Sequence, residues 1–528
     1  MTESTKRNIN FDYIFNEIRP ITEYGIKAKQ DAKPFIKGQE AELLEEFNKI
    51  EAFLEMRQRR DVIDILKHIK NIIETIERAK NNQVLDEVEL FEIKNFLMQI
   101  ERMEKSLRGT LISIYEDLKL SPLPQLYEIL DPANEKMYTF YIYDEYSERL
   151  KNLRAQKKET DILIRRLKKE IKSELQERYN IKLNLRDEVT ISKSDKDKLD
   201  ELIKEKNLRV SAENYLSIIF KIKNNEIIDE YEHKIESLTA AEEQEEYEIR
   251  QKISREIKCN YDTLIKNTKT IGRIDYIIAK ANYAQKTKSV KPDITAELEI
   301  EVKNGRNLKL EKTLKEKNKE YVPIDLSLKT NVTCITGANM GGKTVSLRMI
   351  GQITSAASYG MFVPCEYARL CLFEHIHISV GDDQSIEKGL STFGAEIVNL
   401  KDALENSDER CLILIDELAG GTNPKEGYAI TKAVVNYLKK KDCITILTTH
   451  YDNVANDDDV QNLQVAGLNF PDWDVKEMKI SSVDQISKYM DYRLIEVKHE
   501  NFIPKDALKI AKMAGIQDRI IKDAEKYL

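Results

Sequence analysis

Residues 337–344 form the pattern with the clearest chemistry in this sequence. They read Gly-Ala-Asn-Met-Gly-Gly-Lys-Thr, after the apolar run 332–336 and before the helix-like stretch 345–350. A strand, a glycine-rich loop and a helix in this order can bind phosphate, because glycines let successive N–H groups point into one concavity at a helix N-terminus. A glycine-rich turn without a ligand is the alternative. The residues that we expect to bind ATP here are Gly337, Asn339, Met340, Gly341, Gly342, Lys343 and Thr344.

Two side chains of this loop and two acidic residues further along have complementary chemistry. Lys343 can reach the outer phosphates, and the hydroxyl of Thr344 can hold Mg²⁺. The apolar run 411–415 is followed by Asp416 and Glu417. A carboxylate at the end of a buried strand can bind Mg²⁺, and a second one can orient or deprotonate the attacking water. An acidic turn after a strand is the simpler alternative, but the two motifs together predict a P-loop NTPase with ATP and Mg²⁺ as cofactors.

Two further positions are candidates for the same phosphate site. His450 ends another apolar run, where we expect it beside the γ-phosphate. Ser391 and Thr392 open a helix, with Glu396 in its first turn. This pair could only cap the helix, or it could present N–H and hydroxyl groups to a phosphate across a dimer interface.

The elements that must position these residues follow an α/β pattern. Short apolar segments alternate with helical segments, which predicts a largely parallel sheet with helices on both faces. The expected strands are 298–302, 332–336, 411–415 and 444–448, and the expected helices are 345–358, 393–404 and 427–440.

The first half of the chain has a different character. Apolar residues recur at helical spacing over 1–120, as in core-facing helices. Two long helical regions, 144–179 and 226–267, flank a segment 180–225 with strand-like patterns. One long helix that leads away from the rest of the chain and one that returns to it, with a small module between them, would form an arm. The segments that we expect to be strands in this half are 138–143, 181–186 and 215–222.

Composition limits the class of protein. Charged residues make up 33% and aromatic residues 7% of the 528 residues, as in helix-rich proteins with long solvated helices. The net charge of −8 does not indicate a strongly basic nucleic-acid binder, although a local basic face is compatible with it. Without an apolar stretch of membrane-spanning length, a signal-peptide core or a CxxC pair, we expect a cytoplasmic protein with free thiols and no membrane partner.

Taken together, these motifs resemble those of the MutS family ATPase domain, in the same order. The resemblance is strong over about 300–528 and weaker over about 40–300. The C-terminal stretch 504–528 resembles the helix-turn-helix dimer contact of that family. The four matching segments are 336–344, 389–393, 416–422 and 449–451.

The resemblance implies a multidomain protein. An all-α core and lever region with a small β-containing clamp insertion would precede an α/β P-loop NTPase domain of the ABC-ATPase kind and a C-terminal helix-turn-helix. The corresponding boundaries are a helical core over 1–120, lever helices and clamp-like arm over 121–292, the ATPase domain over 293–500 and the dimer contact over 501–528.

The resemblance also implies roles. Two chains, in a homodimer or a heterodimer, would form two composite ATP sites. Lys343 and Thr344 would act in cis, Asp416 and Glu417 would serve hydrolysis, and Ser391 would reach the γ-phosphate bound by the other subunit. The arms would close around double-stranded DNA as the nucleotide state changes.

Some features depart from the usual MutS pattern. Ala338 replaces the proline that normally follows the first loop glycine, and Asn307 and Leu308 replace a His-Pro pair. We expect no mismatch-reading domain. Residues 381–386 resemble the divergent branch of the family that often carries a C-terminal nuclease domain, which we do not expect in this chain.

Other functions remain open. A compact MutS-like protein also resembles the ATPase that reactivates lysine 5,6-aminomutase by exchanging its damaged cobalamin cofactor, for which 489–494 and 503–508 are weak indications. In that case the partner would be a protein and not DNA. A clamp that does not hydrolyse ATP is disfavoured by the intact Lys343, Asp416 and Glu417.

Overall fold

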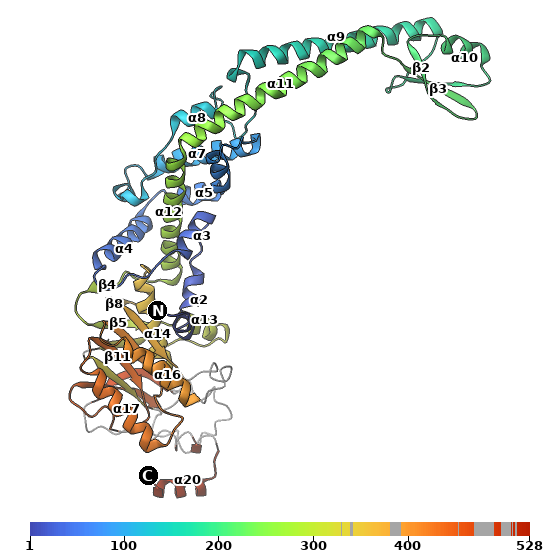
Figure 1. Cartoon of the computed structure of the whole chain (residues 1–528). Helices are drawn as coiled ribbons and strands as arrows, with labels where there is room; N and C mark the ends of the chain where they lie inside the picture. The colour runs from blue at the N-terminus through green and yellow to red at the C-terminus, as the bar shows by residue number, and fades with distance from the viewer. Residues whose placement is uncertain are drawn as a thin grey trace. The chain divides into compact units, whose positions relative to one another are not determined.

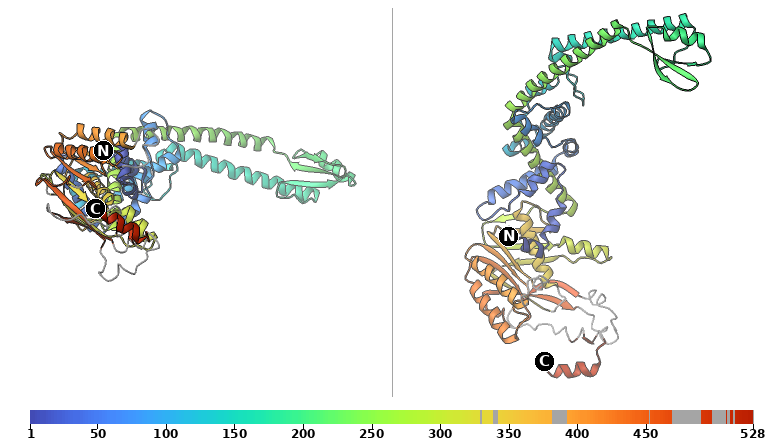
Figure 2. Two further views of the ribbon diagram at one scale, coloured as in Figure 1. Left: turned by 90° about the horizontal axis from the view of Figure 1, so that it is seen from below. Right: turned by 45° about the vertical axis from the view of Figure 1, so that its right-hand side comes forward.

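The computed structural model divides the chain into two compact units (Figures 1 and 2). Unit 1 consists of 1–67, 106–119 and 269–528, and unit 2 of 68–105 and 120–268. The predicted domain boundaries at 120, 292 and 500 stay predictions. The residues that the structure describes are 1–328, 330–337, 342–380, 392–451, 453–468, 490–497, 508, 511–512 and 515–527.

The helices of unit 1 lie before, between and after its strands. Within the described residues, no helix of either unit combines the length and the apolar character needed to cross a membrane. The helices of unit 1 are α1 (Glu3–Asn8), α2 (Phe11–Glu17), α3 (Glu23–Gln30), α4 (Glu40–Glu55), α5 (Arg59–Lys67), α13 (Leu308–Glu316), α14 (Lys343–Ser358), α16 (Thr392–Glu405), α17 (Pro424–Leu438) and α20 (Asp518–Ala524), with 3-10 turns η1 (Leu111–Ile114), η2 (Glu116–Leu118) and η5 (Glu525–Tyr527).

A six-stranded sheet carries the predicted ATPase motifs. Its spatial order is β13-β12-β7-β11-β10-β9, and every neighbouring pair is parallel except β12 and β13. The predicted strands 332–336, 411–415 and 444–448 are confirmed. The strands of this sheet are β7 (Val332–Thr336), β9 (His375–Ser379), β10 (Cys411–Ile415), β11 (Cys443–Thr448), β12 (Val460–Leu468) and β13 (Met490–Glu496).

Both faces of this sheet are buried, which explains why its central strands are continuous apolar runs. Leu412 belongs to one hydrophobic cluster and its neighbour Ile413 to another, as expected when successive side chains point to opposite faces. Helix α14 covers the first face, and α16 and α17 cover the second. The prediction of a largely parallel sheet with helices on both faces is therefore confirmed.

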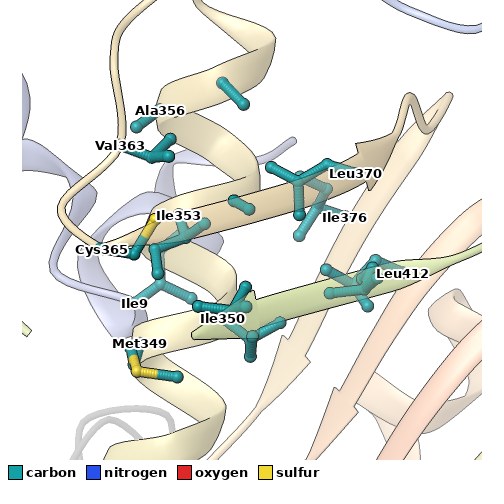
Figure 3. Close-up of a cluster of buried hydrophobic side chains, with 14 of the residues drawn as sticks. Ile9, Met349, Ile350, Ile353, Ala356, Val363, Cys365, Leu370, Ile376 and Leu412 are labelled. Carbon is teal, nitrogen blue, oxygen red and sulfur yellow. The ribbon is translucent and has the colours of Figure 1, made fainter. Parts of the chain in front are cut away.

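A second sheet has four strands in the order β4-β8-β5-β6, with antiparallel pairing of β5 to both β6 and β8. Figure 3 shows Ile350 and Ile353 of α14 in one buried cluster with Leu370 of this sheet and Leu412 of the six-stranded sheet. One core thus joins both sheets. The strand bounds are β4 (Asp293–Thr295), β5 (Ile300–Gly305), β6 (Ile324–Leu328) and β8 (Tyr367–Cys371).

Buried charged groups connect the N-terminal helices of unit 1 to the C-terminal part of α12 (Tyr261–Thr287). The Asp275 carboxylate accepts hydrogen bonds from the backbone N–H groups of Ile21 and Thr22, just before α3. Glu46 of α4 accepts hydrogen bonds from Lys280 and Arg273, each at 2.8 Å. Since Glu46 and Lys280 are only 3% and 2% exposed, each needs the other as a partner.

Unit 2 contains the predicted arm. Helices α9 (Glu148–Tyr179) and α11 (Glu226–Cys259) lie side by side, joined by ion pairs such as Arg154–Glu246 at 2.7 Å (Figure 1). The remaining helices of unit 2 are α6 (Ile73–Lys80), α7 (Glu87–Leu107), α8 (Pro124–Leu130), α10 (Lys196–Ile203) and the 3-10 turn η3 (Asp144–Tyr146).

A small module connects the two arm helices. Its antiparallel sheet has the order β1-β3-β2, from β1 (Glu188–Ser192), β2 (Leu208–Glu213) and β3 (Ser217–Ile222). The strand predicted at 181–186 is wrong, because the Asn184 side chain accepts hydrogen bonds from the N–H groups of Arg186 and Glu188 and forms a turn. Only the later part of the strand predicted at 215–222 is confirmed.

The strand predicted at 138–143 is also wrong. This segment has no ladder partner and is held by side chains instead. The ammonium group of Lys94 donates hydrogen bonds to Asp131, to the carbonyl oxygen of Thr139 and to the hydroxyl of Tyr143, each at 3.1 Å. The sequence of this segment resembles a short strand, whereas a buried polar network fixes its conformation.

The Glu46 ion pair predicts an acid-sensitive stability. Burial raises the pKa of Glu46, but the charges and hydrogen bonds of Lys280 and Arg273 outweigh it and lower the pKa to about 2. Because this folded-state pKa is lower than the ordinary value of 4.5, the stabilisation is complete above pH 4.5 and is lost as the pH falls toward 2. The loss amounts to about 3 kcal/mol of the free energy of unfolding.

Urea unfolding followed by circular dichroism between pH 6 and pH 3 measures this loss. The variant Glu46→Gln is less stable at pH 6, since it leaves Lys280 without its carboxylate, but it loses less stability on acidification than the unmodified chain. Glu42→Gln, on the exposed side of α4, serves as the control and keeps the full acid dependence. Equal acid dependence in Glu46→Gln and the unmodified chain would contradict the prediction.

Candidate functional site

Three neighbouring parallel strands place the predicted site residues at one edge of the six-stranded sheet. Strands β7, β11 and β10 end at Thr336, Thr448 and Ile415, and their carboxyl ends point the same way. Gly337, His450 and Asp416 follow these ends closely. In open α/β sheets, ligands bind beyond the carboxyl ends of the strands. The topology therefore brings together motifs that lie more than a hundred residues apart in sequence.

Lys343 opens helix α14 and lies within this edge. Its side chain is only 5% exposed, and its Nζ donates a hydrogen bond of 3.1 Å to the carbonyl oxygen of Gly337. The same Nζ lies 3.4 Å from Oε1 of Glu417. The cation predicted to bind phosphates thus lies beside the carboxylate predicted to act on water.

The backbone that flanks the loop requires glycine at both ends. Gly337 has φ of 118° and Gly342 has φ of 88°, values that side chains with a Cβ rarely adopt. A Cβ on Gly342 would also lie 3.3 Å from the ring of Tyr492 in β13. Ala338, Asn339, Met340 and Gly341 lie outside the described residues, so their part in the site stays a prediction.

Asp416 is held between two threonine hydroxyls. Thr344 donates to its Oδ2 and Thr448 to its Oδ1, each at 2.6 Å. Thr344 comes from α14, Asp416 follows β10, and Thr448 ends β11. One carboxylate therefore connects the helix after the predicted phosphate loop to two strands of the sheet.

The residues present fit a bound Mg²⁺. A hydroxyl and a carboxylate oxygen in direct contact are hard ligands of the kind that Mg²⁺ takes from proteins when phosphates and water complete its coordination. Within the part of the chain that the structure describes, no cluster of three or more metal-ligating acidic, histidine or cysteine side chains exists. A metal bound by Thr344 and Asp416 would therefore depend on the nucleotide for its remaining ligands.

Glu417 adopts an unusual backbone conformation. Its φ is 51°, in the left-handed region that is rare for residues other than glycine, and its N–H donates to Oγ1 of Thr448 at 2.9 Å. The side chain is 41% exposed, so water can reach the carboxylate. Strained residues of this kind cluster at functional sites, where surrounding contacts hold them.

His450 is exposed at the same edge, as its position after β11 predicts. Its ring lies against that of Tyr451, with centroids 4.5 Å apart. A Cβ built on Gly420 would lie 3.9 Å from its Cε1, so the imidazole faces the loop after Glu417. Ser391, predicted to act in trans, lies outside the described residues and stays a prediction.

Sequence reasoning missed three contributors to this edge. Thr448 ends the predicted strand 444–448, but only the structure shows its hydroxyl on Asp416. The sequence places Glu396 only near a helix cap, whereas its carboxylate contacts the backbone of Ala419. Tyr451 also reaches Ala419, from the opposite side. Their residue types gave no signal, since threonine, glutamate and tyrosine are common at the ends of helices and strands.

Comparison with known proteins gives a consistent result. Residues 333–528 match the family model of MutS domain V. Endonuclease MutS2 of Caldanaerobacter subterraneus subsp. tengcongensis is 29% identical over 483 residues, which cover 88% of this chain and 57% of that protein. Endonuclease MutS2 of Staphylococcus carnosus is 28% identical over 387 residues, with coverages of 71% and 48%. The chain thus spans about half the length of these curated relatives.

The Asp416 contacts predict a role for Thr448 in metal binding. Thr448→Val removes the hydroxyl that orients Asp416 and leaves the N–H of Glu417 with only the carbonyl oxygen of Thr448 as acceptor, at 3.2 Å. Loss of such a supporting hydrogen bond typically weakens metal affinity by about 10- to 100-fold. We therefore expect the Mg²⁺ concentration that is needed to bind a fluorescent ATP analogue to rise by a similar factor.

Two variants control this experiment. Thr448→Ser keeps the hydroxyl and should retain affinity. Thr445→Val makes the same substitution within β11, away from the carboxyl edge, and should change it little. If Thr445→Val and Thr448→Val weaken the Mg²⁺ dependence equally, the hydroxyl of Thr448 does not orient the metal ligand.

Proposed function

Because the chain is related to the MutS proteins and carries a MutS domain V over residues 333–528, we propose that it is an ATP-hydrolysing, dimeric clamp that holds double-stranded DNA without reading mismatched bases. The observation that supports this most directly is the Asp416 carboxylate, held between Thr344 and Thr448 beside Lys343 and Glu417. This arrangement combines a phosphate-binding cation, a metal-binding pair and a water-accessible carboxylate at one edge.

The chemistry follows from these positions. Lys343 would move from the carbonyl oxygen of Gly337 to the outer phosphates of ATP and neutralise charge there. Mg²⁺, when bound by Thr344 and Asp416, supplies positive charge to the phosphates. Glu417, with an exposed carboxylate, would orient water for attack and accept its proton, and His450 would contact the γ-phosphate from the end of β11. The left-handed backbone of Glu417 aims its side chain toward Lys343.

A second subunit would complete the site. The resemblance of 389–393 to a MutS motif assigns Ser391 to the γ-phosphate bound by the partner subunit. ATP would then favour the closed dimer, because only that state offers contacts from both chains. The C-terminal stretch 501–528, of which α20 is described, would contribute a helix-turn-helix contact between subunits.

The arm supports a role in binding nucleic acid. It carries exposed cationic side chains along α9, including Arg165 and Arg166, which are 78% and 75% exposed. Curated relatives bear the name endonuclease, an activity on nucleic acid. The chain as a whole carries a net charge of −8, so attraction to phosphates must be local to such faces. We place the protein in the cytoplasm, with backbone and shape contacts in place of base-specific ones.

Replacement of Glu417 separates ATP binding from hydrolysis. Glu417→Gln keeps the size of the side chain but removes the proton acceptor, so turnover should fall by about 100-fold or more while ATP binding persists. Phosphate release and equilibrium binding of a labelled ATP measure the two properties. Glu426→Gln, on an exposed residue of the neighbouring α17, is the control. Retained turnover in Glu417→Gln would remove this carboxylate from the mechanism.

Binding to duplex DNA tests the clamp. The affinity should fall steeply as the salt concentration rises, because neutralised phosphates release counterions. Arg165→Glu with Arg166→Glu should weaken binding and reduce the salt dependence, whereas Lys315→Glu with Lys317→Glu, an equal change of charge at the C-terminal end of α13, should not. If the chain binds no DNA at low salt with or without ATP, the client is a protein, such as the cobalamin-dependent aminomutase of the alternative hypothesis.

A further inference from the structure

One residue next to the predicted catalytic carboxylate is held from two sides through its backbone. Ala419 lies two residues after Glu417 and is completely buried. Its φ of 58° is left-handed, like that of Glu417 at 51°. Alanine gains nothing from this conformation, because its Cβ approaches the following carbonyl oxygen. The conformation therefore depends on contacts made by the surrounding elements.

The N–H group of Ala419 is bound by helix α16. It donates a hydrogen bond of 3.2 Å to Oε2 of Glu396, the fifth residue of the helix. Burial raises the pKa of Glu396, and the nearby charge of Glu417 acts in the same direction. None of these contacts is with a cation that would balance the charge of Glu396. We conclude that Glu396 contributes to the fold as a hydrogen-bond acceptor.

The carbonyl oxygen of Ala419 is bound from the other side. It accepts a hydrogen bond of 2.9 Å from the hydroxyl of Tyr451. The backbone N–H of Tyr451 donates to Oγ1 of Thr449 at 3.0 Å, which fixes the start of this segment after β11. Gly427 in α17 leaves the room that the hydroxyl needs, since a Cβ there would lie 2.0 Å from it. Three elements thus converge to orient this one phenol group.

The two groups that hold Ala419 are close in sequence to the predicted γ-phosphate contacts. Glu396 follows Ser391 on the helix that begins at Thr392, and Tyr451 directly follows His450. Movement of either phosphate contact would therefore shift a group that holds the turn after Glu417. The turn itself is short, because the N–H of Gly420 returns to the carbonyl oxygen of Glu417 at 3.1 Å.

We propose that Glu396 and Tyr451 are positioning residues for ATP hydrolysis, which act by holding the backbone of Ala419 and, through it, the left-handed conformation of Glu417. This inference rests on the proposed ATPase function. The two residues transmit the positions of the start of α16 and the end of β11 to the carboxylate that orients water. Neither residue contacts ATP in this scheme.

The proposal makes distinct predictions for three variants. Glu396→Ala and Tyr451→Phe each remove one hydrogen bond to Ala419, so kcat should fall by about tenfold, while KM and ATP affinity change by less than about twofold. Glu396→Gln keeps an oxygen that can accept the same N–H and should retain kcat within about threefold of the unmodified chain. The double variant should lose less than the product of the two single losses, because both groups hold the backbone of the same residue.

Matched controls identify non-specific effects. Glu405→Ala changes the same residue type in the last turn of α16, and Tyr437→Phe removes a half-exposed phenol from α17. Both should leave kcat unchanged. Hydrogen exchange of peptides that cover 416–422 gives a second measurement that needs no turnover. Exchange there should accelerate in Glu396→Ala and Tyr451→Phe but not in the controls or in Glu396→Gln.

The outcomes separate this proposal from the function on which it rests. If the unmodified chain hydrolyses no ATP, the proposed function fails, and hydrogen exchange still decides whether the two residues hold the turn. If the chain hydrolyses ATP but Glu396→Ala behaves like Glu405→Ala, the positioning role is wrong. Equal losses of kcat in Glu396→Gln and Glu396→Ala, or a parallel loss of ATP binding, would also overturn it.

Discussion

The hydrogen bonds from Thr344 and Thr448 to the two oxygens of Asp416 are the contacts on which the candidate site depends. They join the helix after the phosphate loop to two parallel strands, with both distances at 2.6 Å. Strands β7, β10 and β11 are buried along their whole length and contain no charged residue, so the charged groups of the site follow their carboxyl ends.

The surroundings of Asp416 also explain how strain is tolerated. Glu417 and Ala419 both have left-handed backbones, and each makes backbone hydrogen bonds to side chains of other elements. Thr448 holds the first, and Glu396 and Tyr451 hold the second. The conformation of the turn is therefore a property of three elements that surround it. If a contact at any of these elements changes with the bound nucleotide, the position of the Glu417 carboxylate would change as well. The reason is that packed cores shift between discrete arrangements.

Buried charges play a comparable part in the helical regions. Glu46 with Lys280, Asp275 with the backbone before α3, and Lys94 with Asp131 each fix segments that are distant in sequence. Removing one partner of such a pair is costly, because the other charge stays buried. Lys94 shows why a local pattern can mislead: its side chain holds the segment 138–143 in place by hydrogen bonds, so this strand-like segment needs no strand partner.

Short sequence patterns are enough to predict those features of this protein that depend only on residues close together in the chain. The apolar run 411–415, the glycines at 337 and 342 and the acidic pair after the run predict a strand, a loop and a phosphate chemistry without reference to the rest of the chain. Tertiary structure alone decided that Thr448 orients Asp416 and that Glu396 and Tyr451 hold Ala419. These contacts join different elements, and a threonine, a glutamate or a tyrosine has no spacing pattern that reveals a partner brought near only by folding.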